Sequence, residues 1–555
     1  MFSAFWGSCF RFLAEMFYKT DDFKQKENVM FIRKIICLAG VLAAAPILAT
    51  AVVESPPPIS VVLDYGMQGT VNNRALPPAL RHTAEEAKAI AERRAADWCA
   101  LGYVPKQPYR SGHYFREWTR GYIWENRRDL FGLTPYGSRG IEKKGVPDWL
   151  GALSKVCVSN EGVVDMRIER WKREGMPQQL IAGENDGFLG FCRCKGCKAL
   201  DADLPGEPFL KNKTDRYLNL WNRICEKARR LRPDVRVCVF AYSLLRHPPR
   251  RERVAFPDNL IVSYVPTYHD ISPGKAIMGW KNSGLRHFYN RPNFLCNQTV
   301  FPIGREKYIY EVDKALRQLG SLGSCYDATH GVASTGFEMY AAVRTCADPG
   351  VSFDEIEHGW CARFGAASNT VQAYYSRVRE RCDRRWERLL SVLSRHSIEF
   401  LDDSHFSRCY HALHTEKELE NDLRFLEKFD GSVLSGEEGR RFADLKLVAQ
   451  HFVLTRKAFG SRSAADKERL VAFRSQWRDQ LGFAWAAHWN KGELPLWENS
   501  YIRRFYSDLG ISSYVETFEN ALRSTPARQL MRKMESPLDE ALKDFEQSAE
   551  YGAEK

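Results

Sequence analysis

Residues 214–242, TDRYLNLWNRICEKARRLRPDVRVCVFAY, place an amphipathic segment directly before an apolar one. Between Thr214 and Leu231 apolar side chains recur every three or four residues, which predicts a helix with one buried face. The positions on that face are Tyr217, Leu220, Trp221, Ile224, Ala228 and Leu231. The run from Val235 to Tyr242 predicts a strand. A helix that leads into a strand is a repeating unit of parallel α/β sheets.

The same alternation extends on both sides of this unit, at a spacing of roughly 25–45 residues that is typical of parallel βα units. No Gly-rich phosphate loop follows any strand, and polar residues gather just after the strands. A (β/α)8 TIM-type barrel, in which the carboxyl ends of the strands face one site, is therefore favoured over a doubly wound sheet. Further strands are expected at 179–182, 260–265, 286–289 and 323–326, and further helices at 83–100, 275–283 and 306–319.

Composition restricts the class of protein. Of 555 residues, 44% are apolar and 27% are charged, which supports a large packed core and excludes a disordered or collagen-like chain. The net charge of +12 is spread thinly, with short clusters such as RHPPRRER at 246–253, so nucleic-acid binding is disfavoured. A polyanionic substrate and a basic surface tuned for solubility both stay open.

The N-terminal region has the three-part pattern of a secretory signal. A basic stretch begins at Met30, an apolar run covers 35–48, and Ala49-Thr50-Ala51 supplies a cleavage site. The alternative is an uncleaved anchor. We expect a secreted or periplasmic protein with no membrane contact after cleavage. The expected divisions are a mis-assigned start (1–29), a signal peptide (30–51), a Pro-containing linker with a helical segment (52–104), the barrel (105–395) and a mainly helical C-terminal domain with a polar tail (396–555).

Three polar residues, Glu184, Asn185 and Asp186, follow the strand at 179–182. Burying all three in a core would carry a large desolvation cost, so at a barrel mouth we expect them to face substrate. Glycosidic cleavage needs a proton donor at the leaving oxygen, and substrate-assisted cleavage also needs a polar group that holds the 2-acetamido group of the sugar. Asp186 could be the general acid and Asn185 the orienting group, with Glu184 in contact with substrate. The alternative is a strand-end turn with an Asx cap.

Asp327, at the end of the strand at 323–326, is the candidate second carboxylate, because two carboxyl groups that face one sugar shift each other's pKa values apart. A helix cap or an ion pair is the alternative. Glu338 is a weaker candidate on the following helix. Other candidate substrate contacts, each of which could equally be structural, are His113, Tyr242, Tyr268, Trp280, Asn290 and Arg291.

Three of the 15 cysteines, Cys192, Cys194 and Cys197, lie within six residues. They could bind a structural zinc ion if a fourth ligand came from elsewhere, such as Asp201 or a distant His, or they could form a disulfide and leave one free thiol. Both are favoured over a catalytic metal, and no cofactor is required for the expected chemistry. No HExxH, GxSxG or Walker pattern occurs in the chain.

Several segments together resemble the glycan-associated family catalogued as domain of unknown function 4838. They are GENDGFLGFCRCKGCKALD (183–201), TDRYLNLWNRICEKARRLRPD (214–234), VFAYSLLRHPP (239–249), MGWKNSGLRHFYNRPN (278–293), YDATHGVASTGFEMYAAVRTCADPG (326–350) and FGAASNTVQAYY (364–375). The resemblance covers roughly residues 105–395 and implies a glycoside-hydrolase-type barrel in exported bacterial proteins. Some members are classed in glycoside hydrolase family 163, the endo-β-N-acetylglucosaminidases that act on N-glycans.

The leading hypothesis is therefore an exported glycoside hydrolase that cleaves a glycan or glycoprotein at an N-acetylhexosamine. One alternative is a catalytically silent barrel that binds glycans. Another is a hydrolase of a sulfated or uronate-rich polysaccharide, suggested by the net charge and by Arg291.

Overall fold

The structure is a computed structural model of the 555-residue chain. The chain divides into two compact units, residues 1–53 and 54–555, and everything described below lies in the second. The expected start error and signal peptide fall outside the described residues. Those residues are 61–63, 83–102, 126–133, 139, 155–185, 191–205, 212–266, 273–292, 304–326, 332–396, 409, 412–461, 463–481 and 540–547.

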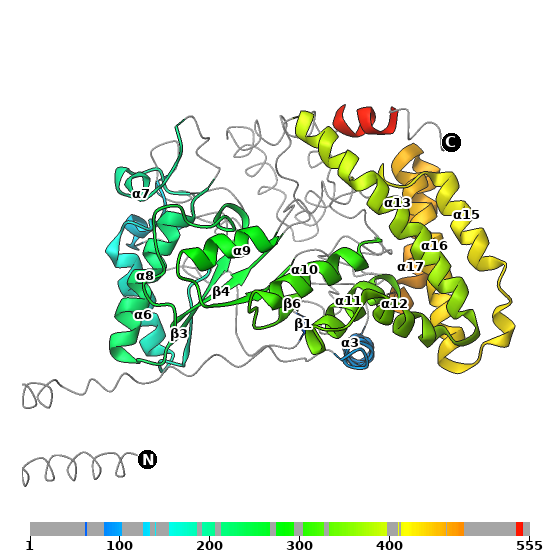
Figure 1. The fold of residues 1–555 in the computed structure, drawn as a ribbon, viewed down its shortest axis with the longest axis horizontal. Helices are drawn as coiled ribbons and strands as arrows, with labels where there is room; N and C mark the ends of the chain where they lie inside the picture. The colour runs from blue at the N-terminus through cyan, green and yellow to red at the C-terminus, as the bar shows by residue number, and fades with distance from the viewer. Residues whose placement is uncertain are drawn as a thin grey trace, which may run out of the picture. The chain divides into compact units, whose positions relative to one another are not determined.

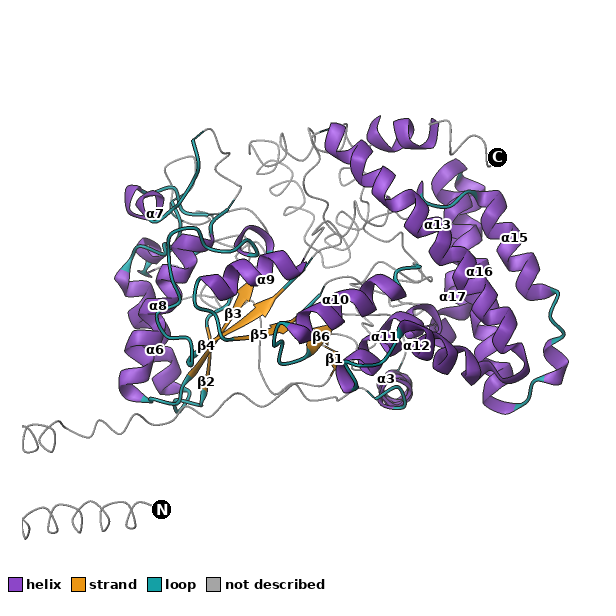
Figure 2. Ribbon diagram, in the orientation of Figure 1, coloured by secondary structure: helices purple, strands orange, loops and turns teal. Residues whose placement is uncertain are grey.

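A six-stranded parallel sheet forms the centre of the α/β region (Figure 2). Its strand order is β1-β6-β5-β4-β3-β2, and every neighbouring pair is parallel. The strands are β1 (Val61–Leu63), β2 (Gln179–Ile181), β3 (Arg236–Ala241), β4 (Leu260–Tyr264), β5 (His287–Asn290) and β6 (Ser324–Tyr326). Five of them were expected from the sequence. β1 was not, because three residues next to a Pro-rich stretch are too few for a periodic signal.

Helices precede or follow most of the strands (Figure 1), and the described connection from β3 to β4 holds only the short 3-10 helix η5 (Ser243–Leu245). The α-helices of this region are α3 (Ala84–Cys99), α6 (Glu161–Arg173), α7 (Lys195–Ala199), α8 (Thr214–Leu231), α9 (Pro273–Asn282), α10 (Glu306–Gln318) and α11 (Val332–Ala347). In α8 the expected apolar face is buried from Tyr217 to Ala228, whereas Leu231 is 46% exposed because the helix ends there. Burial of each large side chain on that face contributes about 1.5–3 kcal/mol to folding.

The two faces of the sheet are covered differently. Alternate residues of β3 and β4, such as Val239 and Val262, belong to the hydrophobic cluster that includes the buried faces of the helices. On the opposite face, Cys238, Ile261, Tyr289 and Cys325 form a second layer, with one buried side chain from each of four neighbouring strands. Among the described residues no helical side chain joins this layer.

This asymmetry favours a barrel-type arrangement, because a doubly wound sheet carries helices on both faces and a barrel fills its interior with layers of strand side chains. The six strands make a curled, half-barrel sheet. In the described part of the chain, the outer strands β1 and β2 do not pair with each other. Closure into eight strands therefore stays a prediction.

The C-terminal part of the described chain is helical. Its elements are α12 (Phe353–Cys361), the short 3-10 helix η6 (Ala362–Ala367), α13 (Ser368–Arg395), α15 (Glu416–Glu427), η7 (Gly431–Val433), α16 (Gly436–Ser461) and α17 (Ala464–Leu481). A capping box begins α15, since the Glu418 amide donates to Thr415 Oγ1 (3.2 Å) and the Thr415 amide donates to Glu418 Oε2 (2.8 Å). Among the described residues one hydrophobic cluster includes side chains from Trp98 to Phe545. The division at residue 396 stays a prediction.

None of the helices in the described ranges combines the length and the apolar character needed to span a bilayer.

Candidate functional site

Glu184 and Asn185 lie directly after β2, at the carboxyl end of the sheet. Hydrogen bonding to β3 continues past the strand, where the Ala182 amide donates to the Cys238 carbonyl (2.8 Å). Glu184 is 4% exposed and Asn185 is 2% exposed. Both line a small pocket with a cavity volume of about 10 Å³, room for about one water molecule. The other lining residues are Lys155, Phe191, Phe240, Tyr242, Ser243 and Leu245.

The Glu184 carboxylate is held at both oxygens. Oε1 accepts the Asn185 backbone N–H (2.6 Å), and Oε2 accepts the hydroxyl of Tyr217 from α8. Burial raises the pKa of Glu184, while the nearby Lys155 ammonium and the Tyr217 hydrogen bond oppose that rise. Glu184 therefore acts mainly on the backbone beside it.

Lys155 completes a clamp around Asn185. It is 1% exposed, its ammonium donates to the Asn185 carbonyl, and it lies 5.4 Å from the centroid of the Phe191 ring. The peptide N–H of Asn185 is thus bound by Glu184 and its carbonyl by Lys155. Fixing both backbone groups of one residue restricts where its side chain can point, and such rigidity is what a substrate-orienting group requires.

An aromatic and cationic rim lies beside this clamp. Phe240 and Tyr242 come from the end of β3, and the Arg291 guanidinium after β5 lies 5.0 Å from the Phe240 ring centroid. Ser243 has a φ of 54°, a left-handed conformation that is unusual for a residue with a side chain and is often found at functional sites. The placements of Asn185, Tyr242 and Arg291 at the strand ends agree with those expected from the sequence.

Asn290 is part of a buried hydrogen-bond network that connects elements of the fold. Its Nδ2 donates to Asp313 Oδ1 (2.6 Å), which also accepts the Ser324 hydroxyl (2.6 Å), and Tyr326 donates to Asp313 Oδ2 (2.7 Å). All of these residues are fully or almost fully buried. This network ties α10 to β5 and β6 and does not line the described pocket.

Two further candidates lie inside the core. Trp280 on α9 is fully buried, and its indole N–H donates to the Arg246 carbonyl (3.2 Å), so neither ring face is available for stacking on a sugar and that role does not fit the packing. Glu338 lies on α11, as expected, and is fully buried. Its charge contributes to the raised pKa of Tyr375, for which burial is the larger cause.

Asp186, Asp327, His113 and Tyr268 lie outside the described residues, so their roles stay predictions.

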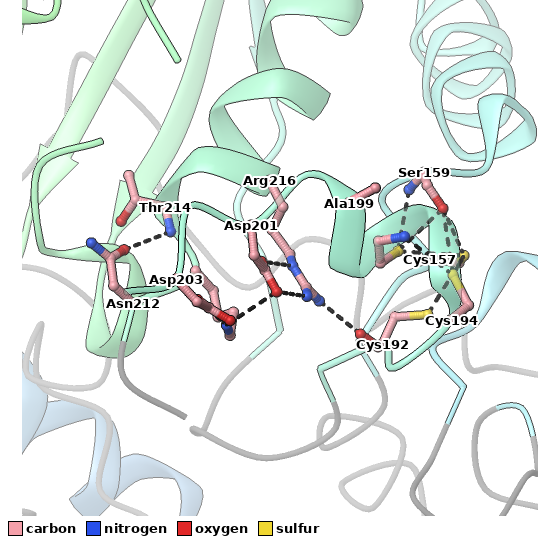
Figure 3. A network of polar contacts seen from close by, with 12 residues as sticks. Cys157, Ser159, Cys192, Cys194, Ala199, Asp201, Asp203, Asn212, Thr214 and Arg216 are labelled. Carbon is pink, nitrogen blue, oxygen red and sulfur yellow. Dashed lines mark hydrogen bonds and ion pairs between the residues drawn. The ribbon is translucent and has the colours of Figure 1, made fainter. Parts of the chain in front are cut away.

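The cysteine cluster contains a fourth member, Cys157, from the segment that precedes α6. Its Sγ lies 3.6 Å from Cys192 Sγ, 3.7 Å from Cys194 Sγ and 3.7 Å from Cys197 Sγ. Figure 3 shows the sulfur atoms gathered around Ser159. Sulfhydryl hydrogen bonds from Cys192 and Cys197 hold the pKa of Cys157 below its usual range.

Asp201 is not part of this cluster, contrary to one option considered from the sequence. Asp201 accepts a hydrogen bond from Arg216 Nε (2.6 Å) and forms an ion pair with Lys213 Nζ (3.1 Å). Arg216 also donates to the Cys192 carbonyl (2.8 Å), as Figure 3 shows, so α8 anchors the cysteine segment. Sequence reasoning missed Cys157, Lys155, Phe191 and Tyr217, since each joins the site through a contact between distant segments.

Two solved structures illustrate what the chain is similar to. A point mutant of the Thermobaculum terrenum O-GlcNAc hydrolase matches at 11% identity and a TM-score of 0.29, covering 66% of this chain and 78% of that one. A GH138 enzyme targeting pectin rhamnogalacturonan II matches at 10% identity and a TM-score of 0.32, covering 84% of this chain and 68% of that one. Likeness at this level is too low to define a shared reaction.

No curated protein matches the chain. A family model does match, over residues 81–376, and its description is "Domain of unknown function (DUF4838)". This range exceeds half of the 555 residues and includes β2 to β6, the pocket and the cysteine cluster. The chain therefore belongs to the DUF4838 family.

Proposed function

We propose that this chain is an exported glycoside hydrolase that cleaves a complex glycan at an N-acetylhexosamine. Membership of the DUF4838 family supports this proposal, because the resemblance implies that some members are classed in glycoside hydrolase family 163. The observation that carries it is the clamp on Asn185, whose N–H is bound by Glu184 and whose carbonyl is bound by Lys155 in a pocket at the carboxyl end of β2.

The mechanism assigns roles to two neighbours in the chain. Asn185 holds the amide of the 2-acetamido group, and Asp186 donates a proton to the glycosidic oxygen. The acetamido oxygen attacks the anomeric carbon as the bond to the leaving oxygen breaks, which forms an oxazolinium intermediate. Asp186, now a carboxylate, accepts a proton from the water that opens this intermediate. Glu184 and Lys155 are positioning residues that act through Asn185.

The substrate-assisted route and a route with two carboxylates differ in how strongly the sheet must curl to bring the catalytic groups together. Asp327 follows β6, which lies four strand positions from β2 in the sheet. At the usual spacing between strands, a flat sheet would put these ends roughly 19 Å apart. Glycosidase carboxylate pairs lie only about 5–9.5 Å apart. Asp327 can act as the second carboxylate only if the sheet curls strongly, whereas adjacent residues need no such closure.

The test incubates the full chain with N-glycoproteins and, separately, with sulfated glycans, and reads the products by mass spectrometry. We expect release from N-glycoproteins by the wild type, a loss of about 10²–10⁴-fold in Asp186→Asn, and no loss in Asp258→Asn. Asp258 is the matched control, because its carboxylate is half exposed and pairs with Arg286 on the surface.

Equal release by Asp186→Asn would contradict the acid assignment. Binding of glycans without release, by the wild type and the variant alike, would support the silent glycan-binding barrel. Release only from sulfated glycans, falling steeply with added salt, would support the anionic-polysaccharide hydrolase and Arg291 as its contact.

A further inference from the structure

The four sulfur atoms of Cys157, Cys192, Cys194 and Cys197 lie close enough together to bind one metal ion. All lie within 4.8 Å of one another, and Cys157 Sγ lies 3.6–3.7 Å from the other three. Zinc–sulfur bonds of about 2.3 Å in tetrahedral geometry place the sulfurs roughly 3.8 Å apart. A disulfide would bring two of them to about 2.05 Å, and all four are free thiols.

Backbone donors point at three of these sulfurs. The amide of Leu133 donates to Cys192 Sγ (3.2 Å), that of Ser159 to Cys197 Sγ (3.4 Å) and that of Cys197 to Cys194 Sγ (3.4 Å). Such donors stabilise thiolate charge, which metal ligation creates and neutral thiols lack. The Ser159 hydroxyl lies 3.3 Å from Cys197 Sγ and 3.5 Å from Cys194 Sγ, and Arg139 supplies a nearby cation.

The cluster joins the segments that carry the pocket wall. Lys155 is two residues before Cys157, and Phe191 is one residue before Cys192; both line the pocket. Arg216 of α8 binds the Cys192 carbonyl, and the next residue, Tyr217, binds Glu184. A metal ion bound by these cysteines would therefore fix Lys155 and Phe191 relative to Glu184 and Asn185.

We propose that Cys157, Cys192, Cys194 and Cys197 bind one zinc ion in a structural site that holds Lys155 and Phe191 in the wall of the pocket. Four thiolate ligands complete the coordination of zinc and leave no position for substrate or water, so the ion has no part in bond cleavage. The assignment concerns metal binding and holds whether or not the chain is a hydrolase.

Metal content tests whether the four cysteines bind zinc. We expect elemental analysis of the full chain, expressed with zinc, to find one zinc per chain in the wild type and in Cys225→Ala. Cys225 is a buried free thiol on α8, outside the cluster. Cys157→Ser should retain less than a tenth of the wild-type zinc. If that variant does not fold, cobalt substitution of the wild type serves instead, because tetrahedral cobalt thiolate has a distinctive visible absorption. Iron in place of zinc, or a disulfide among the four cysteines in the metal-free chain as isolated, would overturn the proposal.

Hydrogen exchange tests whether the bound zinc holds Lys155 and Phe191 in place. Stripping the metal with a chelator should increase deuterium uptake in peptides that cover 155–160 and 191–197, and leave 416–427 in α15 unchanged. Restored zinc should restore protection. Unchanged uptake around Lys155 and Phe191 after complete metal loss would refute the link to the pocket.

Discussion

Two carboxyl groups, Glu184 after β2 and Asp313 on α10 beside β5 and β6, are similarly buried. Each is almost fully removed from water, burial raises the pKa of each, and each accepts a hydrogen bond from a buried tyrosine, Tyr217 in one case and Tyr326 in the other. By the criteria of burial and perturbed pKa, both would be candidates for a functional site.

The groups that surround the two carboxyl groups differ. Glu184 lines a pocket, faces the Lys155 ammonium and holds the backbone of Asn185. Asp313 is enclosed by side-chain donors, two of them Asn290 and Ser324, and joins α10 to the sheet. A raised pKa thus reports burial at both places, and only the adjoining pocket suggests chemistry at one of them.

The largest expected effect comes from the two asparagines. Asn185→Ala should lower kcat/KM by about 10²–10³-fold, because it removes a preorganised contact to the reacting group. Asn290→Ala should stay within threefold of the wild type in kcat/KM per folded molecule, since Asn290 binds Asp313. Steady-state kinetics with circular dichroism measures both. A similar loss of turnover in the two variants would contradict the different roles assigned to Asn185 and Asn290.

Removing the carboxylates comes next. Glu184→Ala should lower kcat about 10²-fold by releasing the Asn185 backbone, and Glu184→Gln should restore part of that loss. Asp313→Ala should lower the free energy of unfolding by about 3 kcal/mol, because three buried donors lose their acceptor, with turnover per folded molecule retained. Urea denaturation and active-site titration separate the two outcomes. Full activity of Glu184→Ala would remove its positioning role.

Changing the two tyrosines should have smaller effects than changing the carboxyl groups. Tyr217→Phe and Tyr326→Phe should each lower the free energy of unfolding by about 1 kcal/mol, since each deletes one buried hydrogen bond. Only Tyr217→Phe should change the pH profile of kcat, and it should shift the acid limb to higher pH, because the lost hydrogen bond holds the pKa of Glu184 down. Identical profiles for both variants would contradict a role for Glu184 in turnover.

The smallest effect is a pH dependence of stability. The pKa of Asp313 in the folded protein is raised above its ordinary value of 3.8. Its contribution to stability is therefore full below pH 3.8 and is lost as pH rises through the raised pKa. Compared with Asp313→Asn, the wild type should lose unfolding free energy as pH rises across that range in urea titrations. A relative gain would show that the hydrogen bonds outweigh burial.

Much of the fold follows from local patterns. The spacing of apolar residues located α8, α9 and α10 and the strands β2 to β6 within a few residues, because helical and extended periodicity are properties of short segments. The capping box formed by Thr415 and Glu418 is likewise a local signal, because Thr415 is the N-cap and Glu418 lies in the first turn of α15. The pairing of β1 with β6 was beyond such reasoning, since it joins residues 61–63 to 324–326.

The candidate site divides in the same way. By itself the sequence determined that Glu184, Asn185 and Asp186 follow a buried strand, that Cys192, Cys194 and Cys197 cluster, and which family the segments resemble. Only the tertiary structure decided that Cys157 completes the cluster, that Lys155 and Tyr217 secure Glu184 and Asn185, and that Trp280 is sealed in the core. The physical reason is that these contacts join residues from 30 to 40 positions apart, whose proximity arises from packing of whole helices and strands and leaves no trace in local periodicity.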